Sequence, residues 1–86
     1  PFSRHLRWRR LRTLKKCSGK ECIKILCNKF GFRPVRQTGS HVILRKDTPQ
    51  GTFGTSVPNH KELKIGTLKS VLELAKVSEE EFSQYQ

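Results

Sequence analysis

The sequence predicts an α+β fold of the order α-β-β-β-α, a sandwich in which a three-stranded antiparallel sheet carries two helices on one face. Three observations predict it. An amphipathic segment with helix-capping residues comes first, three short segments rich in β-branched residues follow, and a second amphipathic segment comes after them. The 86 residues suffice for one domain, and we divide the chain into an N-terminal arm, 1–16, and a domain, 17–86.

The first helix is predicted over 19–30. Ser18 precedes it and Glu21 stands three residues later, which is the capping box that satisfies free backbone N–H groups at a helix start. Apolar residues then recur at helical spacing through Phe30, and Gly31 stands where a left-handed residue would end the helix.

Three strands are predicted next, over 32–37, 41–46 and 52–57. The first two are joined by a three-residue loop, Thr38-Gly39-Ser40, and the second connection is a turn over 47–51 that contains proline and glycine. Pro34 lacks an N–H donor, so we expect the first strand to lie at the edge of the sheet or to be bulged there.

A second amphipathic helix is predicted over 65–76, where apolar residues again recur at helical spacing. The run from Ser78 to Glu81 repeats the capping-box pattern and predicts a short C-terminal helical turn through Phe82.

The net positive charge of the chain indicates which classes of partner it could bind. The chain carries 18 Lys and Arg against 7 Asp and Glu, and its first sixteen residues hold seven of the basic residues and no acid. We expect this arm to be flexible, although its apolar residues would also fit one side of a basic helix. A strongly basic domain attracts polyphosphate, so nucleic acid is the expected partner; an anionic membrane surface or an acidic protein also fits the charge.

Several classes of protein are excluded. No apolar run approaches the length of a membrane span, and the chain is too short for a fold that binds a large cofactor. A single Asp and no converging pair of acids disfavour two-metal and glycosidase chemistry. Cys17, Cys22 and Cys27 are spaced by five, which suits free thiols of a cytoplasmic protein better than a metal site. We therefore expect no metal, no small-molecule cofactor and no membrane association.

His41 is the candidate catalytic residue. It follows Gly39 and Ser40 at a predicted strand start, where glycine allows close approach of a substrate and the Ser40 hydroxyl can donate to a phosphate. A histidine in that position can exchange a proton near neutral pH, and RNA supplies its own nucleophile, the 2′-OH. The simpler interpretation is that His41 only hydrogen-bonds a loop carbonyl or a ribose.

A second basic group precedes the second helix. His60 is a possible accessory residue, and the start of that helix offers N–H groups suited to phosphate. The residues predicted to bind RNA are Arg36, Gly39, Arg45, Lys61, Lys64, Gly66 and Lys69. For the lysines, a solvated helix face is the simpler interpretation.

These motifs resemble the HicA (YcfA-like) toxin family. The resemblance is carried, from Lys16 to Phe82, by the segments Ser18-Gly19-Lys20-Glu21, Gly31-Phe32, Arg36-Gln37-Thr38-Gly39-Ser40-His41, Val57-Pro58 with His60, Lys61-Glu62-Leu63-Lys64 and Gly66-Thr67-Leu68. It departs from the family at Ile65, where proline is frequent, and residues 1–15 match nothing in it.

The resemblance implies a double-stranded-RNA-binding-domain-like fold and an mRNA interferase, the toxin of a type II toxin–antitoxin system. It also implies metal-independent cleavage of mRNA with the histidine of Gly-Ser-His, here His41, as the essential residue, and a HicB-type antitoxin as protein partner. Two alternatives stay open: a double-stranded-RNA-binding module without catalysis, and a DNA-binding repressor whose arm reaches a minor groove.

Overall fold

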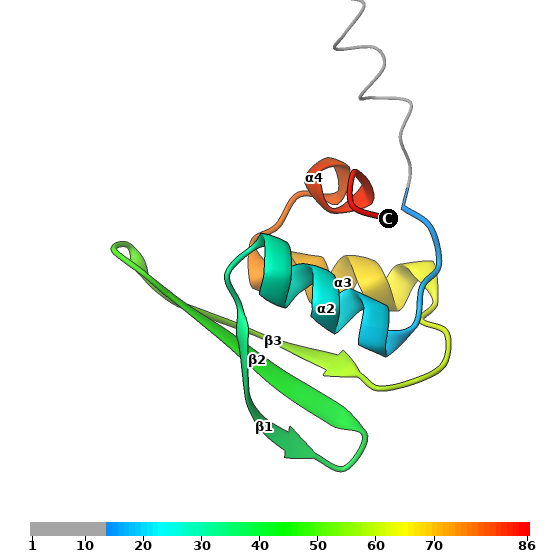
Figure 1. The fold of residues 1–86 in the computed structure, drawn as a ribbon, viewed down its shortest axis with the longest axis horizontal. Helices are drawn as coiled ribbons and strands as arrows, with labels where there is room; N and C mark the ends of the chain where they lie inside the picture. The colour runs from blue at the N-terminus through cyan, green and yellow to red at the C-terminus, as the bar shows by residue number, and fades with distance from the viewer. Residues whose placement is uncertain (1–13) are drawn as a thin grey trace, which may run out of the picture.

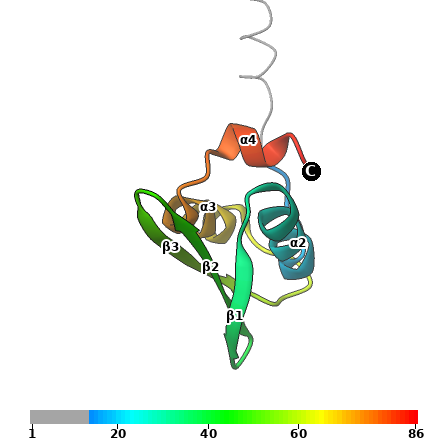
Figure 2. The same ribbon diagram turned by 60° about the vertical axis from the view of Figure 1, so that its left-hand side comes forward.

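The computed structural model describes residues 14–86, so most of the predicted arm, 1–13, lies outside the described residues. In chain order the elements are α2 (Gly19–Lys29), β1 (Arg33–Thr38), β2 (His41–Thr48), β3 (Gly51–Pro58), α3 (Ile65–Ala75) and α4 (Glu79–Ser83). The strands form one antiparallel sheet of order β1-β2-β3, and α2 and α3 lie side by side on the same face of it (Figures 1 and 2). The predicted α-β-β-β-α architecture is confirmed.

Helix α2 begins and ends as its sequence predicts. The Ser18 hydroxyl accepts from the Glu21 N–H at 3.0 Å, and the Glu21 carboxylate accepts from the Ser18 N–H at 3.2 Å. At the other end Gly31 has a φ of +79°, which lets the Phe32 N–H donate to the Leu26 carbonyl at 3.1 Å. Phe32 then turns back into the core, where it is buried.

The sheet shows one predicted irregularity and two differences. The second connection consists of Pro49 and Gln50 rather than the predicted turn over 47–51, because Thr48 pairs with Gly51. Strand β1 is an edge strand, and its pairing with β2 shifts between Pro34 and Arg36, as expected for a bulge next to proline. The loop before His41 has two residues rather than the predicted three, because Thr38 pairs directly with His41. Gly39 at the first loop position has a φ of +59°, the pattern of a type II′ hairpin turn, which suits the twist of the strands.

The core lies between the sheet and the two long helices. Its buried apolar residues are Cys22, Leu26, Phe32, Leu44, Val57, Leu63, Leu68, Val71, Leu72, Ala75 and Phe82. One buried hydroxyl joins the two layers, since Thr55 of β3 donates to the Val71 carbonyl of α3 at 2.8 Å. Phe82 comes from the short helix α4, which therefore contributes to the core.

Two contacts bring distant segments together. The Cys17 carbonyl accepts from the Leu63 N–H at 2.7 Å, which fixes the start of α2 against the segment that leads into α3. The Gln86 side chain forms two hydrogen bonds with the backbone of Lys15, accepting from its N–H at 2.8 Å and donating to its carbonyl at 2.6 Å. No helix within residues 14–86 has both the length and the apolar character required to cross a membrane.

Candidate functional site

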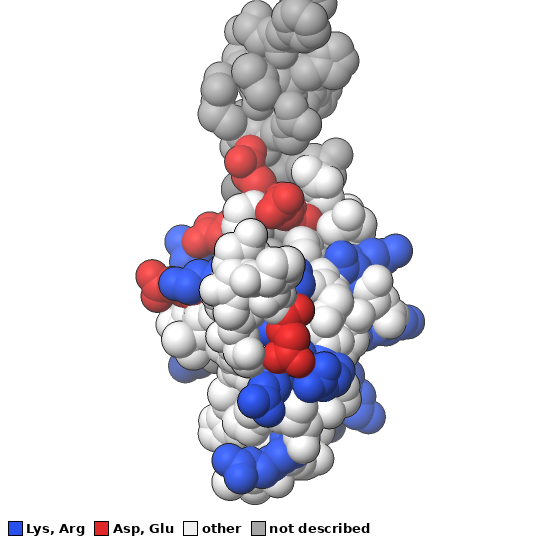
Figure 3. Space-filling model, turned by 90° about the vertical axis from the view of Figure 1, so that its left-hand side faces the viewer, with Lys and Arg blue, Asp and Glu red and all other residues white. Residues whose placement is uncertain are grey.

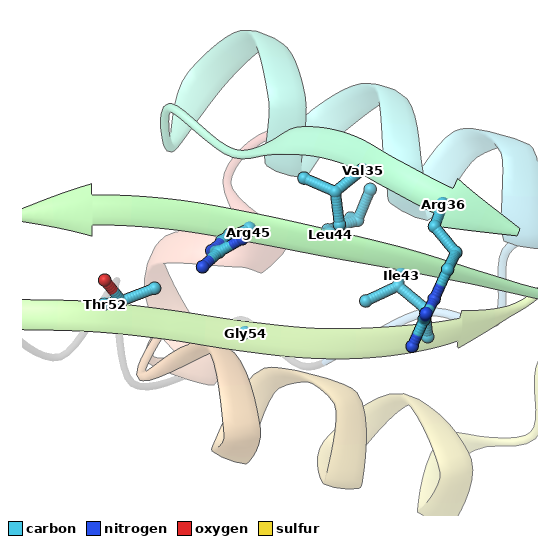
Figure 4. A pocket seen from close by; sticks show the side chains of 7 residues that line it. All are labelled: Val35, Arg36, Ile43, Leu44, Arg45, Thr52 and Gly54. Carbon is cyan, nitrogen blue, oxygen red and sulfur yellow. The ribbon is translucent and has the colours of Figure 1, made fainter.

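The sheet has one face that no helix covers within the described residues. Leu44 is buried on the helix side, and neighbouring strand residues point to opposite faces, so His41, Ile43 and Arg45 point away from the helices. Arg36 is the strand partner of Ile43 and shares that face. Figure 4 shows the side chains of Arg36 and Arg45 on this face, with the helices behind the sheet. They line an open hollow of about 440 Å³.

His41 is exposed at one end of this face. It is the first residue of β2, directly after the Gly39–Ser40 turn, and it pairs with Thr38 on one side and Pro58 on the other. A local hydrogen bond stabilises the turn, because the Gln37 side chain donates to the Gly39 carbonyl at 3.1 Å. The histidine is therefore held by backbone pairing on both sides while its ring faces solvent.

An ion pair lies at the other end of the face. Arg33 contacts the carboxylate of Asp47 at 3.2 Å, and Thr52 donates to the same carboxylate at 3.1 Å. The Thr52 hydrogen bond, followed by the nearby arginines, lowers the pKa of Asp47 below its ordinary value. This is the only ion pair within residues 14–86, so neither Arg36 nor Arg45 forms a direct ion pair there, although the charge of Arg45 acts on Asp47.

His60 and Lys61 lie at a different hollow, of about 290 Å³, together with Ser18, Lys20 and Asn59. The loop that carries them is joined to the His41 turn, because the Asn59 N–H donates to the Ser40 carbonyl at 2.6 Å. Lys20 was not singled out from the sequence as a site residue. The signal that could have found it is Gly19, whose missing side chain allows the His60 loop to approach the start of α2.

The remaining predicted RNA-binding residues lie on α3. Lys64 is the N-cap residue of that helix and makes no side-chain capping bond, and Gly66 in the first turn has open space around it. Lys69 follows Gly66 by three positions on α3, and it lines a hollow that also contains Glu73 and Glu79. On the side of the molecule drawn in Figure 3, the lower part carries Lys and Arg without Asp or Glu.

The three cysteines are free thiols. Burial raises the pKa of Cys22 to about 12 and also raises the pKa values of Cys17 and Cys27. These thiols therefore stay protonated at neutral pH and are poor nucleophiles. Within the described part of the chain, no three His, Cys, Asp or Glu side chains are grouped so that they could hold a metal ion.

Comparison with known proteins gives one match. A family model described as the HicA toxin of bacterial toxin–antitoxin matches residues 19–77. The matched segment contains α2, the whole sheet with His41, and α3, and it ends before α4. No match was found among curated proteins or among solved structures.

Proposed function

Because the chain belongs to the HicA toxin family of bacterial toxin–antitoxin systems, we propose that it is a metal-independent endoribonuclease that cleaves mRNA. The single observation that carries this proposal is the exposure of His41, on an uncovered sheet face that also presents Arg36 and Arg45. A proton-transfer group beside free cations is what cleavage of RNA by its own 2′-OH requires.

In the proposed mechanism the 2′-oxygen attacks the neighbouring phosphorus and the bond from phosphorus to the 5′-oxygen breaks. His41 either accepts the proton of the 2′-OH or donates a proton to the leaving 5′-oxygen, and solvent water makes the other of these two proton transfers. Arg36 and Arg45 bind the phosphates and offset the negative charge that develops on them. The products are a 2′,3′-cyclic phosphate and a free 5′-OH.

The remaining predicted residues serve the same substrate in this proposal. Ser40 is placed by the turn beside His41, and Gly39 gives the turn its conformation. Lys61, Lys64 and Gly66 lie in the loop after β3 and at the start of α3, where they would hold further phosphates of the strand. We propose mRNA in the cytoplasm as substrate and a HicB-type antitoxin, bound over the face that carries His41, as inhibitor.

The proposal is tested by comparing the wild type with His41→Ala on a 5′-labelled RNA in EDTA. We expect cleavage with cyclic phosphate ends in the wild type and a loss of at least about a hundredfold in the variant, the size of a general acid or base contribution. Because His41 is exposed, the variant keeps its fold, which circular dichroism can verify.

Two results would contradict the proposal. One is cleavage by His41→Ala at the wild-type rate, and the other is cleavage that EDTA abolishes. Tight binding of duplex RNA without cleavage over a long incubation would instead identify a double-stranded-RNA-binding module, which the same fold supports.

A further inference from the structure

We propose that the hollow between the start of α2 and the loop after β3 binds a phosphate of the RNA strand away from the scissile bond, with Lys20 and Lys61 as its cations. This inference rests on the proposed ribonuclease function, because it assigns a second contact to the same substrate. It adds Lys20, which neither the motif analysis nor the family match singles out, to the substrate-binding residues.

The lining of the hollow specifies the ligand. Its residues are Ser18, Lys20, Asn59, His60 and Lys61. None of these side chains is apolar and none is acidic, so the hollow offers hydrogen-bond donors and positive charge to a ligand. Its volume of about 290 Å³ is open to solvent, which suits a hydrated phosphate group rather than an enclosed small molecule.

Two carboxylates are adjacent in sequence to these lysines, Glu21 and Glu62, and neither lines the hollow. Glu21 follows Lys20, but its side chain accepts hydrogen bonds from the backbone and hydroxyl of Ser18 in the capping box. Glu21 lines a separate hollow, between α2 and Tyr85. Lys20 and Lys61 form no ion pair within residues 14–86, so both ammonium groups are available to an anion.

Backbone contacts hold the two halves of the hollow together. The Gly19 N–H donates to the His60 carbonyl at 2.8 Å, and the Leu63 N–H donates to the Cys17 carbonyl at 2.7 Å. The first and the last residue of segment 60–63 are thus hydrogen-bonded to the start of α2. Lys20 and Lys61, distant in sequence, are therefore positioned before any ligand binds, which lowers the entropic cost of binding.

The hollow lies within reach of a strand bound at His41. Pro58 is the strand partner of His41, and His60 lies two positions after Pro58 in the chain. Paired residues lie about 5.5 Å apart and each further residue adds at most about 3.6 Å, so the Cα atoms of the two histidines lie within roughly 13 Å. With one phosphate per roughly 3.4 Å of stacked strand, a few nucleotides span that distance.

The test measures binding of a labelled single-stranded oligoribonucleotide over a range of salt concentrations. All proteins carry His41→Ala, so that no RNA is cleaved during the measurement, and wild-type cleavage is assayed in parallel. The test variant is Lys20→Gln/Lys61→Gln. The matched control is Lys24→Gln/Lys29→Gln, which removes the same charge from exposed positions of α2 outside the hollow.

We expect the test variant to lower the slope of log K against log salt by about 0.7, the value for one lost phosphate contact on a single strand, while the control leaves the slope unchanged. Equal slopes in the test and control variants, with RNA bound and cleaved by the wild type, would overturn this inference alone. If the wild type neither binds nor cleaves RNA, the proposed function fails and the inference fails with it.

Discussion

Gly19 and Pro58 approach so closely that a Cβ atom added to Gly19 would overlap the carbonyl oxygen of Pro58. The same atom would lie 2.9 Å from the Cα of Asn59, and Gly19 itself is buried. The first residue of α2 is therefore glycine because the end of β3 passes directly over it. This contact sets the position of His60 relative to the helix.

We expect Gly19→Ala to lower the free energy of unfolding by about 2 kcal/mol, since backbone atoms must move to make room. Gly66→Ala is the matched control: it lies in the first turn of α3 with nothing near its Cβ position, and alanine favours helix by up to about 1 kcal/mol. Urea unfolding curves measure the free energy of unfolding of both variants. Equal effects of the two substitutions would contradict the close approach.

Phe82 makes α4 part of the domain, although the family match ends at residue 77. Its side chain is fully buried, so Phe82→Ala is expected to cost about 3–5 kcal/mol of unfolding free energy. Leu74→Ala, which removes a side chain that is 58 % exposed, is expected to cost well under about 1 kcal/mol. Thermal and urea unfolding measure the stability of both variants. A small effect of Phe82→Ala would show that α4 contributes little to the stability of the domain.

Because the Cys22 thiol is buried, we expect the free energy of unfolding to decrease at alkaline pH. Its pKa rises from 9.0 to about 12 on folding, so its contribution is intact below pH 9 and is lost as the pH rises. Between pH 9 and 12 this thiol lowers the free energy of unfolding by about 1.4 kcal/mol for each pH unit.

Comparison with Cys22→Ala isolates this contribution from other titrating groups. The variant is less stable than the wild type at pH 7 because it leaves a small cavity, and we expect the difference to shrink above pH 9. Cys27→Ala, at a half-buried position, is expected to show less convergence. Parallel stability curves for Cys22→Ala and the wild type from pH 7 to 11 would contradict the prediction.

Arg45 and Arg33 are strand partners, and only Arg33 is paired with an acid. If the proposed function holds, Arg45→Gln raises the KM for RNA about tenfold and changes kcat little. A tenfold change corresponds to the loss of one charged hydrogen bond, which contributes about 1.5 kcal/mol. The control Arg33→Gln/Asp47→Asn removes an arginine from the same region and keeps the net charge. Steady-state cleavage kinetics in which both variants change KM equally would contradict this assignment.

The helices and the bulge could be predicted because their signals are short-range. The Ser18–Glu21 capping box, the left-handed position of Gly31 and the missing N–H of Pro34 each act within a few residues along the chain. The loop before His41 was predicted one residue too long. Threonine is common in turns, but Thr38 pairs with His41 because the twist of two antiparallel strands favours a two-residue connection.

The environment of the basic residues could not be predicted from local sequence. Lys20 meets His60 only because the loop after β3 packs on the start of α2, and no periodicity in the sequence encodes that contact. Glu73 lies one turn after Lys69 on α3, which helical spacing predicts, but Glu79 of α4 reaches the same hollow only through the packing of the chain. Charge shows that a chain binds polyanions, while tertiary contacts decide which charges are available.

The paired hydrogen bonds between Lys15 and Gln86 bring the two ends of the described chain to one place beside α4, at the opposite end of the molecule from the Gly39–Ser40 turn (Figure 1). A short peptide bridge between these residues would close the domain into a ring without disturbing the sheet. Opening that ring at the exposed Pro49–Gln50 turn gives a circular permutant that retains every helix and strand. Such a permutant offers new ends for attaching a fluorophore while leaving the surface around His41 accessible.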